Sequence, residues 1–120
     1  MAINFKDALG LHADALQLRA QRTRILASNI ANENTPGYSA QDIDFKESLA
    51  RVEAELSGEP ILDGDGETKF RVPYHPSGDG NTVEIGVEQA AFSQNATDFA
   101  TSLTFINMKL RGIAKAINGQ

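Results

Sequence analysis

The two histidines are the side chains of this sequence best suited to bind a metal ion. His12 falls in the patterned N-terminal segment, and His75 stands between Tyr74 and Pro76 in a stretch rich in glycine and proline. A zinc site needs three or four ligands gathered in one place, and neither histidine has a third candidate ligand near it in the sequence. We therefore predict no metal site and expect both histidines to pack or to face solvent.

Two other patterns resemble binding or catalytic sites only in part. The acidic run at residues 63–67 begins like a calcium-binding loop, but the sixth position, which requires glycine, is Thr68. Ser93 and Ser102 have no histidine within reach along a helix, so no nucleophilic triad is indicated. The sequence therefore predicts a protein that is not an enzyme and holds no cofactor, with a small hydrolase as the weakest alternative.

The composition narrows the class of protein further. The chain has 120 residues, no cysteine and a formal net charge of −5. It is therefore one domain or less, and it forms neither disulfides nor zinc–thiolate sites. Nucleic-acid binders need a surplus of Lys and Arg on one face, and this chain has the opposite balance. We therefore expect no nucleic-acid partner.

The charge is unevenly distributed along the chain. Residues 1–32 hold four bases against two acids, and residues 89–120 hold three bases against one acid. Residues 33–88 hold 13 acids against four bases. No stretch approaches the roughly 20 apolar residues of a membrane span, and the first residues lack the basic and apolar regions of a secretory signal peptide. We therefore expect no direct membrane span and, for an exported protein, a route that reads no cleaved signal.

The C-terminal third has the clearest helical pattern. Apolar residues recur there at alternating spacings of four and three, which keeps one stripe of a helix facing a partner helix. We call this stripe the seam, and its members are Phe92, Ala96, Phe99, Leu103, Ile106, Leu110, Ile113 and Ile117. The pattern predicts a helix from Val87 to Asn118 and assigns the seam to helix packing.

The N-terminal segment is also predicted to be helical, with two apolar stripes on opposite sides. One stripe is Phe5, Leu9, Leu16, Ala20, Ala27 and Ile30, and the other is Leu11, Ala15, Leu18 and Ile25. A single partner helix cannot cover both stripes. One explanation is a central helix of an ordinary small bundle. We favour an intermolecular surface, because the chain offers only one other long helix and one short one.

The central segment carries weaker patterns. Asp44 followed by Glu47 resembles a capping box at the start of a short helix, and Gly58 is a helix stop. Residues 69–74 alternate like a strand, which Pro73 restricts to a sheet edge. Glycines and prolines crowd residues 58–80, where we expect a loop or a poorly ordered stretch. We divide the chain into an N-terminal helix (1–34), a central segment (35–86) and a C-terminal helix (87–120).

The energetics of such a chain favour assembly. Burying one seam stabilises a long helix only modestly, while ordering its backbone has a large entropic cost. We therefore expect the long helices to be marginally stable in the isolated chain and to become firmer when neighbouring molecules cover the remaining stripes. Such behaviour is typical of an assembly subunit.

The most distinctive motif in the sequence lies at the end of the predicted N-terminal helix. Pro36 prevents the helix from continuing, Gly37 permits a turn, and Tyr38 is an amphipathic anchor. From local physics alone, this passage is a helix stop that turns the chain. Its members are Ser28, Asn29, Ile30, Ala31, Asn32, Glu33, Asn34, Thr35, Pro36, Gly37 and Tyr38. We call these eleven residues the corner motif.

The corner motif closely resembles a motif of the bacterial flagellar rod, hook and hook-associated axial proteins. Within that group, the short chain, the passage 76–84 and the passage 101–107 followed by Lys109 and Arg111 resemble the FlgB family of proximal rod proteins. The other small proximal rod protein shares the corner motif and stays an alternative. The resemblance covers nearly the whole chain and is weakest at residues 50–70.

The resemblance implies a mainly α fold, a mechanical function and a set of partners. It implies two long terminal helices in an antiparallel coiled-coil hairpin, to which the central patterns add a short helix and an irregular, partly disordered acidic centre. It implies a rod subunit of the flagellar basal body in the periplasmic space, which transmits torque. The implied partners are other rod subunits, the rod-to-membrane-ring adaptor, the membrane ring and the flagellar type III export apparatus. A soluble helical adaptor or export-chaperone-like module is the alternative from another class.

Overall fold

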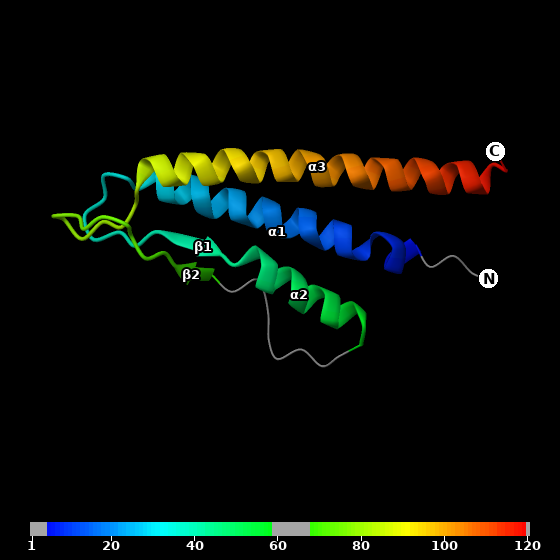
Figure 1. Ribbon diagram of the computed structural model, residues 1–120, viewed down its shortest axis with the longest axis horizontal. Helices are drawn as coiled ribbons and strands as arrows, with labels where there is room; N and C mark the ends of the chain where they lie inside the picture. The colour runs from blue at the N-terminus through cyan, green and yellow to red at the C-terminus, as the bar shows by residue number, and fades with distance from the viewer. Residues whose placement is uncertain (1–4, 59–67, 120) are drawn as a thin grey trace.

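The structure, a computed structural model, describes residues 5–58 and 68–119. The chain is elongated, with extents of 64 × 32 × 18 Å (Figure 1). Its elements in chain order are α1 (Phe5–Ala31), β1 (Gln41–Ile43), α2 (Phe45–Leu56), β2 (Thr68–Phe70) and α3 (Ile85–Ile117). The predicted mainly α class, with two long terminal helices and a short helix between them, is confirmed.

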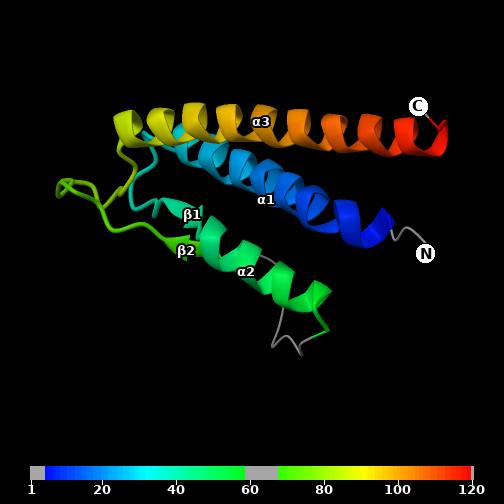
Figure 2. The same ribbon diagram turned by 45° about the vertical axis from the view of Figure 1, so that its right-hand side comes forward.

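The two long helices form an antiparallel hairpin, with the start of α1 and the end of α3 at the same end of the molecule (Figure 1). α3 begins at Ile85, two residues before the predicted start, and ends at Ile117, one residue before the predicted end. The helices lie closest near the strands and diverge toward the chain termini in both ribbon views (Figures 1 and 2). The opening of the hairpin leaves the C-terminal half of α3 largely without cover from its own chain.

The short helix α2 lies along α1 on the side away from α3 (Figure 1). Leu11 and Ala15, two members of the second α1 stripe, line a hollow together with Phe45 and Leu49 of α2. Both residues are half-buried, so α2 covers this stripe only in part, and its assignment to contacts between molecules stays a prediction.

Both ends of α2 follow the predicted signals. The Asp44 side chain accepts a hydrogen bond of 3.1 Å from the backbone N–H of Glu47, which satisfies a helix-start donor that would otherwise have no partner. Gly58 has φ +80°, a left-handed conformation that ends a helix with little strain only when the residue is glycine. The predicted N-cap and the predicted stop are confirmed.

The two strands form a small antiparallel sheet with Gln41 opposite Phe70 and Ile43 opposite Thr68. The strand predicted over residues 69–74 is wrong in extent, because pairing ends at Phe70. Arg71 still donates its N–H to the Ala40 carbonyl at 2.9 Å, but Pro73 has no N–H to continue a ladder. The acidic run 63–67 lies outside the described residues.

The interior is unusually rich in polar groups. Among the described side chains, the buried apolar set is small: Leu18, Leu26, Ala40 and Ile43. The buried polar set is at least as large: Asn29, Ser48, Asn81, Glu88 and Asn95. Because a buried polar group needs a partner, the fold depends on side-chain hydrogen bonds as well as on apolar packing. None of the helices in the described part of the chain is apolar enough over sufficient length to cross a membrane.

Candidate functional site

The corner motif lies where the chain leaves α1 and turns back toward β1. Ser28–Ala31 form the last turn of α1, and residues 32–37 make the turn itself. Gly37 has φ +73°, where a side chain would be strained, and its N–H donates to the Asp79 carbonyl at 2.9 Å. The motif is therefore tied to the loop that leads into α3, and it sets the direction in which the central segment leaves the hairpin.

Asn29 joins three elements through its side-chain amide. Its Nδ2 donates to the Gln41 carbonyl at 2.6 Å and to Glu88 Oε2 at 3.0 Å. Its Oδ1 accepts from the Gln41 N–H at 3.1 Å and from the Tyr38 hydroxyl at 3.3 Å. Asn29 is 0% exposed, and the amide uses both donors and two acceptor positions. This one residue of the motif therefore links α1, β1 and α3.

Glu88 places a carboxylate next to the Asn29 amide. Its side chain is fully buried, and Oε1 accepts from Arg71 Nη1 at 2.7 Å. The other arm of the Arg71 guanidinium, Nη2, donates to Asp42 Oδ2 at 2.6 Å. A buried carboxylate is tolerated only when it is paired and hydrogen-bonded, so Arg71 is the residue that allows Glu88 to lie beneath the corner motif.

Asp42 is held by two arginines. Arg22 of α1 donates Nε to Oδ1 at 2.9 Å and Nη2 to Oδ2 at 3.0 Å, a bidentate pair. Burial alone would raise the pKa of Asp42, but the hydrogen bonds from Arg22 and Arg71 outweigh it and hold this pKa below its usual value. The hydrogen bond to Asp42 likewise raises the pKa of Arg22. We call Arg22, Asn29, Asp42, Arg71 and Glu88 the polar cluster.

The lowered pKa of Asp42 predicts a loss of stability in acid. The carboxylate binds its proton more weakly in the folded than in the unfolded chain, whose Asp pKa is about 3.9. Its contribution is therefore fully present above about pH 4 and is lost as the pH falls through the folded pKa. The free energy of unfolding, measured with urea at a series of pH values across this range, should depend less steeply on pH in Asp42→Asn than in the wild type. Asp14→Asn, an acid away from the polar cluster, is the control, and an equal slope in all three proteins would contradict this assignment.

Asn81, in the loop before α3, contacts the backbone of the corner motif. Its Nδ2 lies 2.9, 2.8 and 2.8 Å from the carbonyl oxygens of Asn32, Glu33 and Thr35, which lie at or just beyond the end of α1. Its Oδ1 accepts from the Val83 N–H at 2.8 Å. The side chain therefore satisfies carbonyl groups that the end of a helix leaves without partners, and it fixes the entry to α3 against the corner motif.

Replacing Asn81 with alanine should lower the free energy of unfolding by about 1–3 kcal/mol, because part-buried carbonyl groups at the end of α1 lose their donor. Chemical unfolding monitored by circular dichroism measures the change. Asn107→Ala, an exposed position on α3, is the matched control and should change the value by less than about 0.5 kcal/mol. Equal effects of the two substitutions would show that the Asn81 contacts do not stabilise the corner.

The contact between α1 and α3 is also polar. Asn95 is buried and donates its Nδ2 to the Arg19 carbonyl at 3.0 Å and to Thr23 Oγ1 at 2.8 Å. Asp98, one turn further along α3, pairs with Arg19 at 3.2 Å. The side of α3 that packs on α1 therefore carries Asn95 and Glu88, which are not members of the seam.

The seam lies beside this contact line. Phe99, Ile106 and Ile113 are half-buried, whereas the other five members are exposed. On α1 the predicted packing residues are half-buried, apart from Leu18, which is buried: Leu9, Leu11, Leu16, Leu18, Ile25 and Ile30. The hairpin of one molecule thus leaves much of the predicted packing surface open, and its assignment to contacts between molecules stays a prediction.

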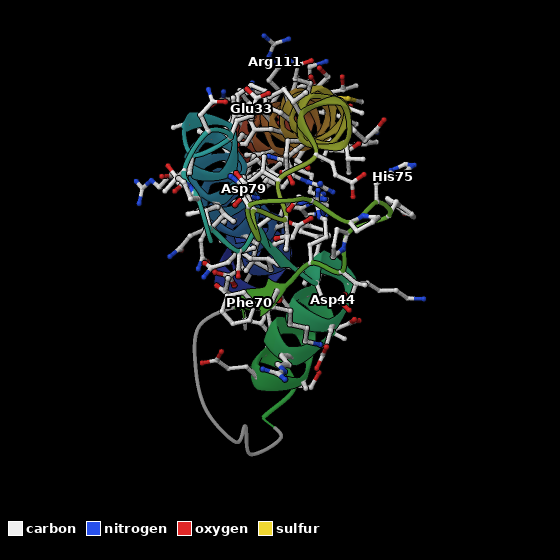
Figure 3. All side chains as sticks on the ribbon, turned by 90° about the vertical axis from the view of Figure 1, so that its left-hand side faces the viewer. Glu33, Asp44, Phe70, His75, Asp79 and Arg111 are labelled. Atoms are coloured by element: carbon white, nitrogen blue, oxygen red, sulfur yellow. The ribbon has the colours of Figure 1, made fainter. Side chains whose placement is uncertain are left out.

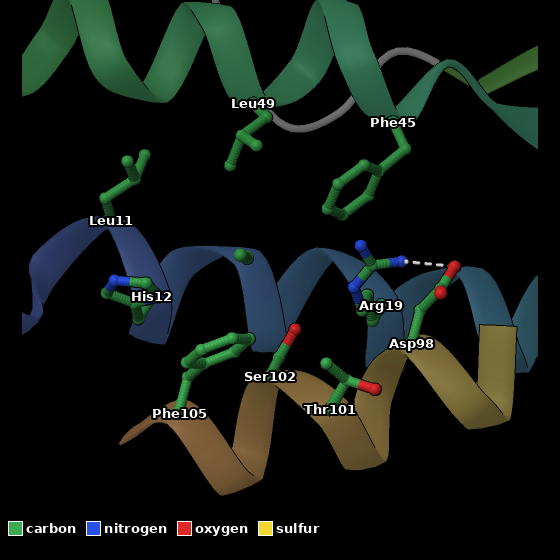
Figure 4. A pocket seen from close by; sticks show the side chains of 10 residues that line it. Leu11, His12, Arg19, Phe45, Leu49, Asp98, Thr101, Ser102 and Phe105 are labelled. Atoms are coloured by element: carbon green, nitrogen blue, oxygen red, sulfur yellow. Dashed lines mark hydrogen bonds and ion pairs between the residues drawn. The ribbon is translucent and has the colours of Figure 1, made fainter. Parts of the chain in front are cut away.

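A groove of about 320 Å³ runs between α2 and α3, with α1 as its floor (Figure 4). Ser102, His12 and Asp98 all line it. Among these described residues no hydrogen bond joins the serine to the histidine, and Asp98 pairs with Arg19 instead. Within residues 5–58 and 68–119, no group of three or more His, Asp or Glu side chains is placed to hold a metal ion. The arrangement supports packing rather than catalysis.

The polar cluster contains several residues that sequence reasoning missed. Asn29 is in the corner motif, but the other members of the polar cluster, Arg22, Asp42, Arg71 and Glu88, are not among the residues that the sequence predicts for a site. Figure 3 views the molecule from the end where the corner motif and the loop leading into α3 lie, with Glu33 and Asp79 labelled. Asn81 lies in the passage 76–84, which the resemblance had marked out, and this was the one available signal.

Known proteins are similar to this chain over nearly its full length. A family model described as flagella basal body rod protein matches residues 9–38, which include the whole corner motif. The flagellar basal body rod protein FlgB of Aeromonas hydrophila is 40% identical over 100% of this chain and 99% of its own. The protein of the same name from Cereibacter sphaeroides is 43% identical, over 97% and 98%. That from Salmonella typhimurium is 36% identical, over 93% and 94%.

Proposed function

Because the chain belongs to the FlgB family of flagellar basal body rod proteins, which are structural proteins and not enzymes, we propose that it transmits torque as a subunit of the proximal rod. In this role it packs through its long helices against neighbouring rod subunits. The observation that carries the proposal is the open apolar surface of α3, on a chain that matches rod proteins from end to end. Covering this surface with neighbours would stabilise both the subunit and the rod.

The proposed partners follow from the same reading. Other rod subunits would cover the α3 seam and the α1 stripes, and the corner motif would fix how each central segment leaves the helical hairpin. The rod-to-membrane-ring adaptor and the membrane ring would bind at the base of the rod in the periplasmic space. The flagellar type III export apparatus would deliver the chain unfolded. The small buried apolar core supports this route, because such a core is easily unfolded.

Deleting the gene and restoring it tests the proposal. The deletion strain should not swim, and the wild-type gene should restore swimming. A tagged chain should then copurify with isolated basal bodies, and the deletion strain should yield basal bodies without a complete rod. A strain that swims normally without the gene would overturn the proposal, as would a functional tagged chain absent from purified basal bodies.

A further inference from the structure

The contact line between α1 and α3 has two buried polar contact points, and they differ in how completely they are hydrogen-bonded. At the corner end, both oxygens of the Glu88 carboxylate accept hydrogen bonds, and the Asn29 amide uses both donors and two acceptor positions. About two turns further along α3, Asn95 donates to the Arg19 carbonyl and to the Thr23 hydroxyl. We call this second point the Asn95 contact.

The Asn95 contact contains two buried polar atoms without partners. Asn95 is 1% exposed, and among the described residues its Oδ1 accepts no hydrogen bond. The Nε of Arg19 is also buried and donates none within the same part of the chain. The Arg19 guanidinium is held in place by Asp98 at 3.2 Å and by the Phe45 ring, whose centroid lies 4.0 Å from Cζ. A buried polar atom without a partner lowers the stability of the contact.

Separating the helices at the Asn95 contact would remove that cost. Water reaches both unpaired atoms once the helices part, so hydration offsets some of the contact energy that is lost. On the terminal side of this contact the packing is loose, because Phe99 and Ile106 are half-buried, Leu103 is 44% exposed, and the helices diverge (Figures 1 and 2). The corner gains no such hydration when it opens, because its buried polar side chains are already paired.

We propose that the hairpin opens first at the Asn95 contact and that this opening keeps the chain easy to unfold for export. The terminal parts of α1 and α3 separate while the corner stays closed, as in other local unfolding reactions of low free energy. The opening depends on the single chain alone, and only its role in export rests on the proposed function. An apolar pair in place of Asn95 and Thr23 should suppress the opening, because such replacements are often neutral or stabilising.

Hydrogen exchange of the backbone amides in the full chain, measured by mass spectrometry, tests the opening. In the wild type, α3 beyond Phe99 should be protected at least about tenfold less than the corner. The double variant Thr23→Val and Asn95→Leu should raise the protection of this part of α3 about tenfold. Asn107→Leu, the same kind of change at an exposed position of α3, is the matched control and should change the protection less than about twofold.

A single substitution should have the opposite effect. Thr23→Val alone removes one acceptor of the Asn95 amide and keeps the shape of the side chain, so the protection should fall several-fold. Asn95→Val takes the place of Asn95→Leu in the double variant if leucine is too large for the site. Equal protection of the wild type and the double variant would overturn the proposed opening. Loss of the helical fold in both double variants would also overturn it, because the polar pair would then be required.

The role in export is measured with the same variants, each tagged and expressed in bacteria that lack the native gene. The double variant should leave the cytoplasm several-fold more slowly than the wild type, because a chain that opens less often is less often ready to unfold. Asn107→Leu should be exported at the wild-type rate. Slower hydrogen exchange with unchanged export would overturn the role in export, while swimming of that strain would leave the rod function intact.

Discussion

Replacing Arg71 with methionine is expected to lower the free energy of unfolding by about 3–5 kcal/mol, because it leaves the Glu88 carboxylate buried without a countercharge. Glu88 is 0% exposed and, among the side chains of residues 5–58 and 68–119, would keep only the amide of Asn29 as a donor. Asp42 would lose the same guanidinium but keep its bidentate pair with Arg22. Most of the loss in stability therefore comes from the unpaired Glu88 carboxylate. Urea unfolding monitored by far-ultraviolet circular dichroism measures it.

Two variants separate loss of the charge pair from loss of the arginine side chain. Glu88→Gln keeps an oxygen acceptor and removes the buried charge, so it should cost only about 1 kcal/mol. Arg111→Met removes an exposed arginine from α3 and should change the free energy of unfolding by less than about 0.5 kcal/mol. Similar losses for Arg71→Met and Arg111→Met would mean that Glu88 needs no countercharge in the fold.

The helices of this protein could be predicted because their signals are local. The seam repeats over eight positions, and α2 is bounded by Asp44 at one end and Gly58 at the other, each of which acts on its own neighbours. The corner motif likewise contains its own stop in Pro36 and its own turn residue in Gly37. Segments whose conformation is decided within one or two turns were therefore predicted close to their observed bounds.

The polar cluster could not be predicted in the same way. Asn29 and Glu88 are 59 residues apart in the chain, and Glu88 and Arg71 are 17 residues apart. Each is of a type usually found at the surface. Their burial results from the strands and the start of α3 meeting beside the end of α1, which no local pattern specifies. Pattern analysis therefore treats these residues as solvent-facing until the tertiary arrangement is known.

The seam illustrates a second limit of periodicity. The spacing of Leu103, Ile106 and Leu110 indicates that they share a face of α3, but it does not indicate which neighbour covers that face. Within one molecule α1 packs along Asn95 and Glu88 instead, and amide and carboxylate groups make the contact. A polar contact line inside the molecule and an apolar stripe beside it fit a subunit that keeps its apolar side for other molecules.

Replacing Leu103 with aspartate is expected to abolish swimming while the chain still folds and is still exported. Leu103 is 44% exposed in the single molecule, so the free energy of unfolding should change by less than about 1 kcal/mol. In an assembled rod the same position would lose about 1.5–3 kcal/mol of apolar burial and gain a charge that needs water. The loss recurs in every subunit. Swimming in soft agar, chemical unfolding and the amount of exported chain measure the three effects.

Two neighbouring substitutions make this result specific. Thr104→Asp introduces the same charge at the next residue, which is exposed and outside the seam, and it should leave swimming largely unchanged. Ile106→Asp lies in the seam at a half-buried position, so it should stop swimming and also lower the free energy of unfolding. The separation of assembly from folding at Leu103, and their combination at Ile106, is what an apolar stripe requires when its own chain covers it in part and neighbours cover the rest. Normal swimming of the Leu103→Asp strain would remove the seam from the rod contacts.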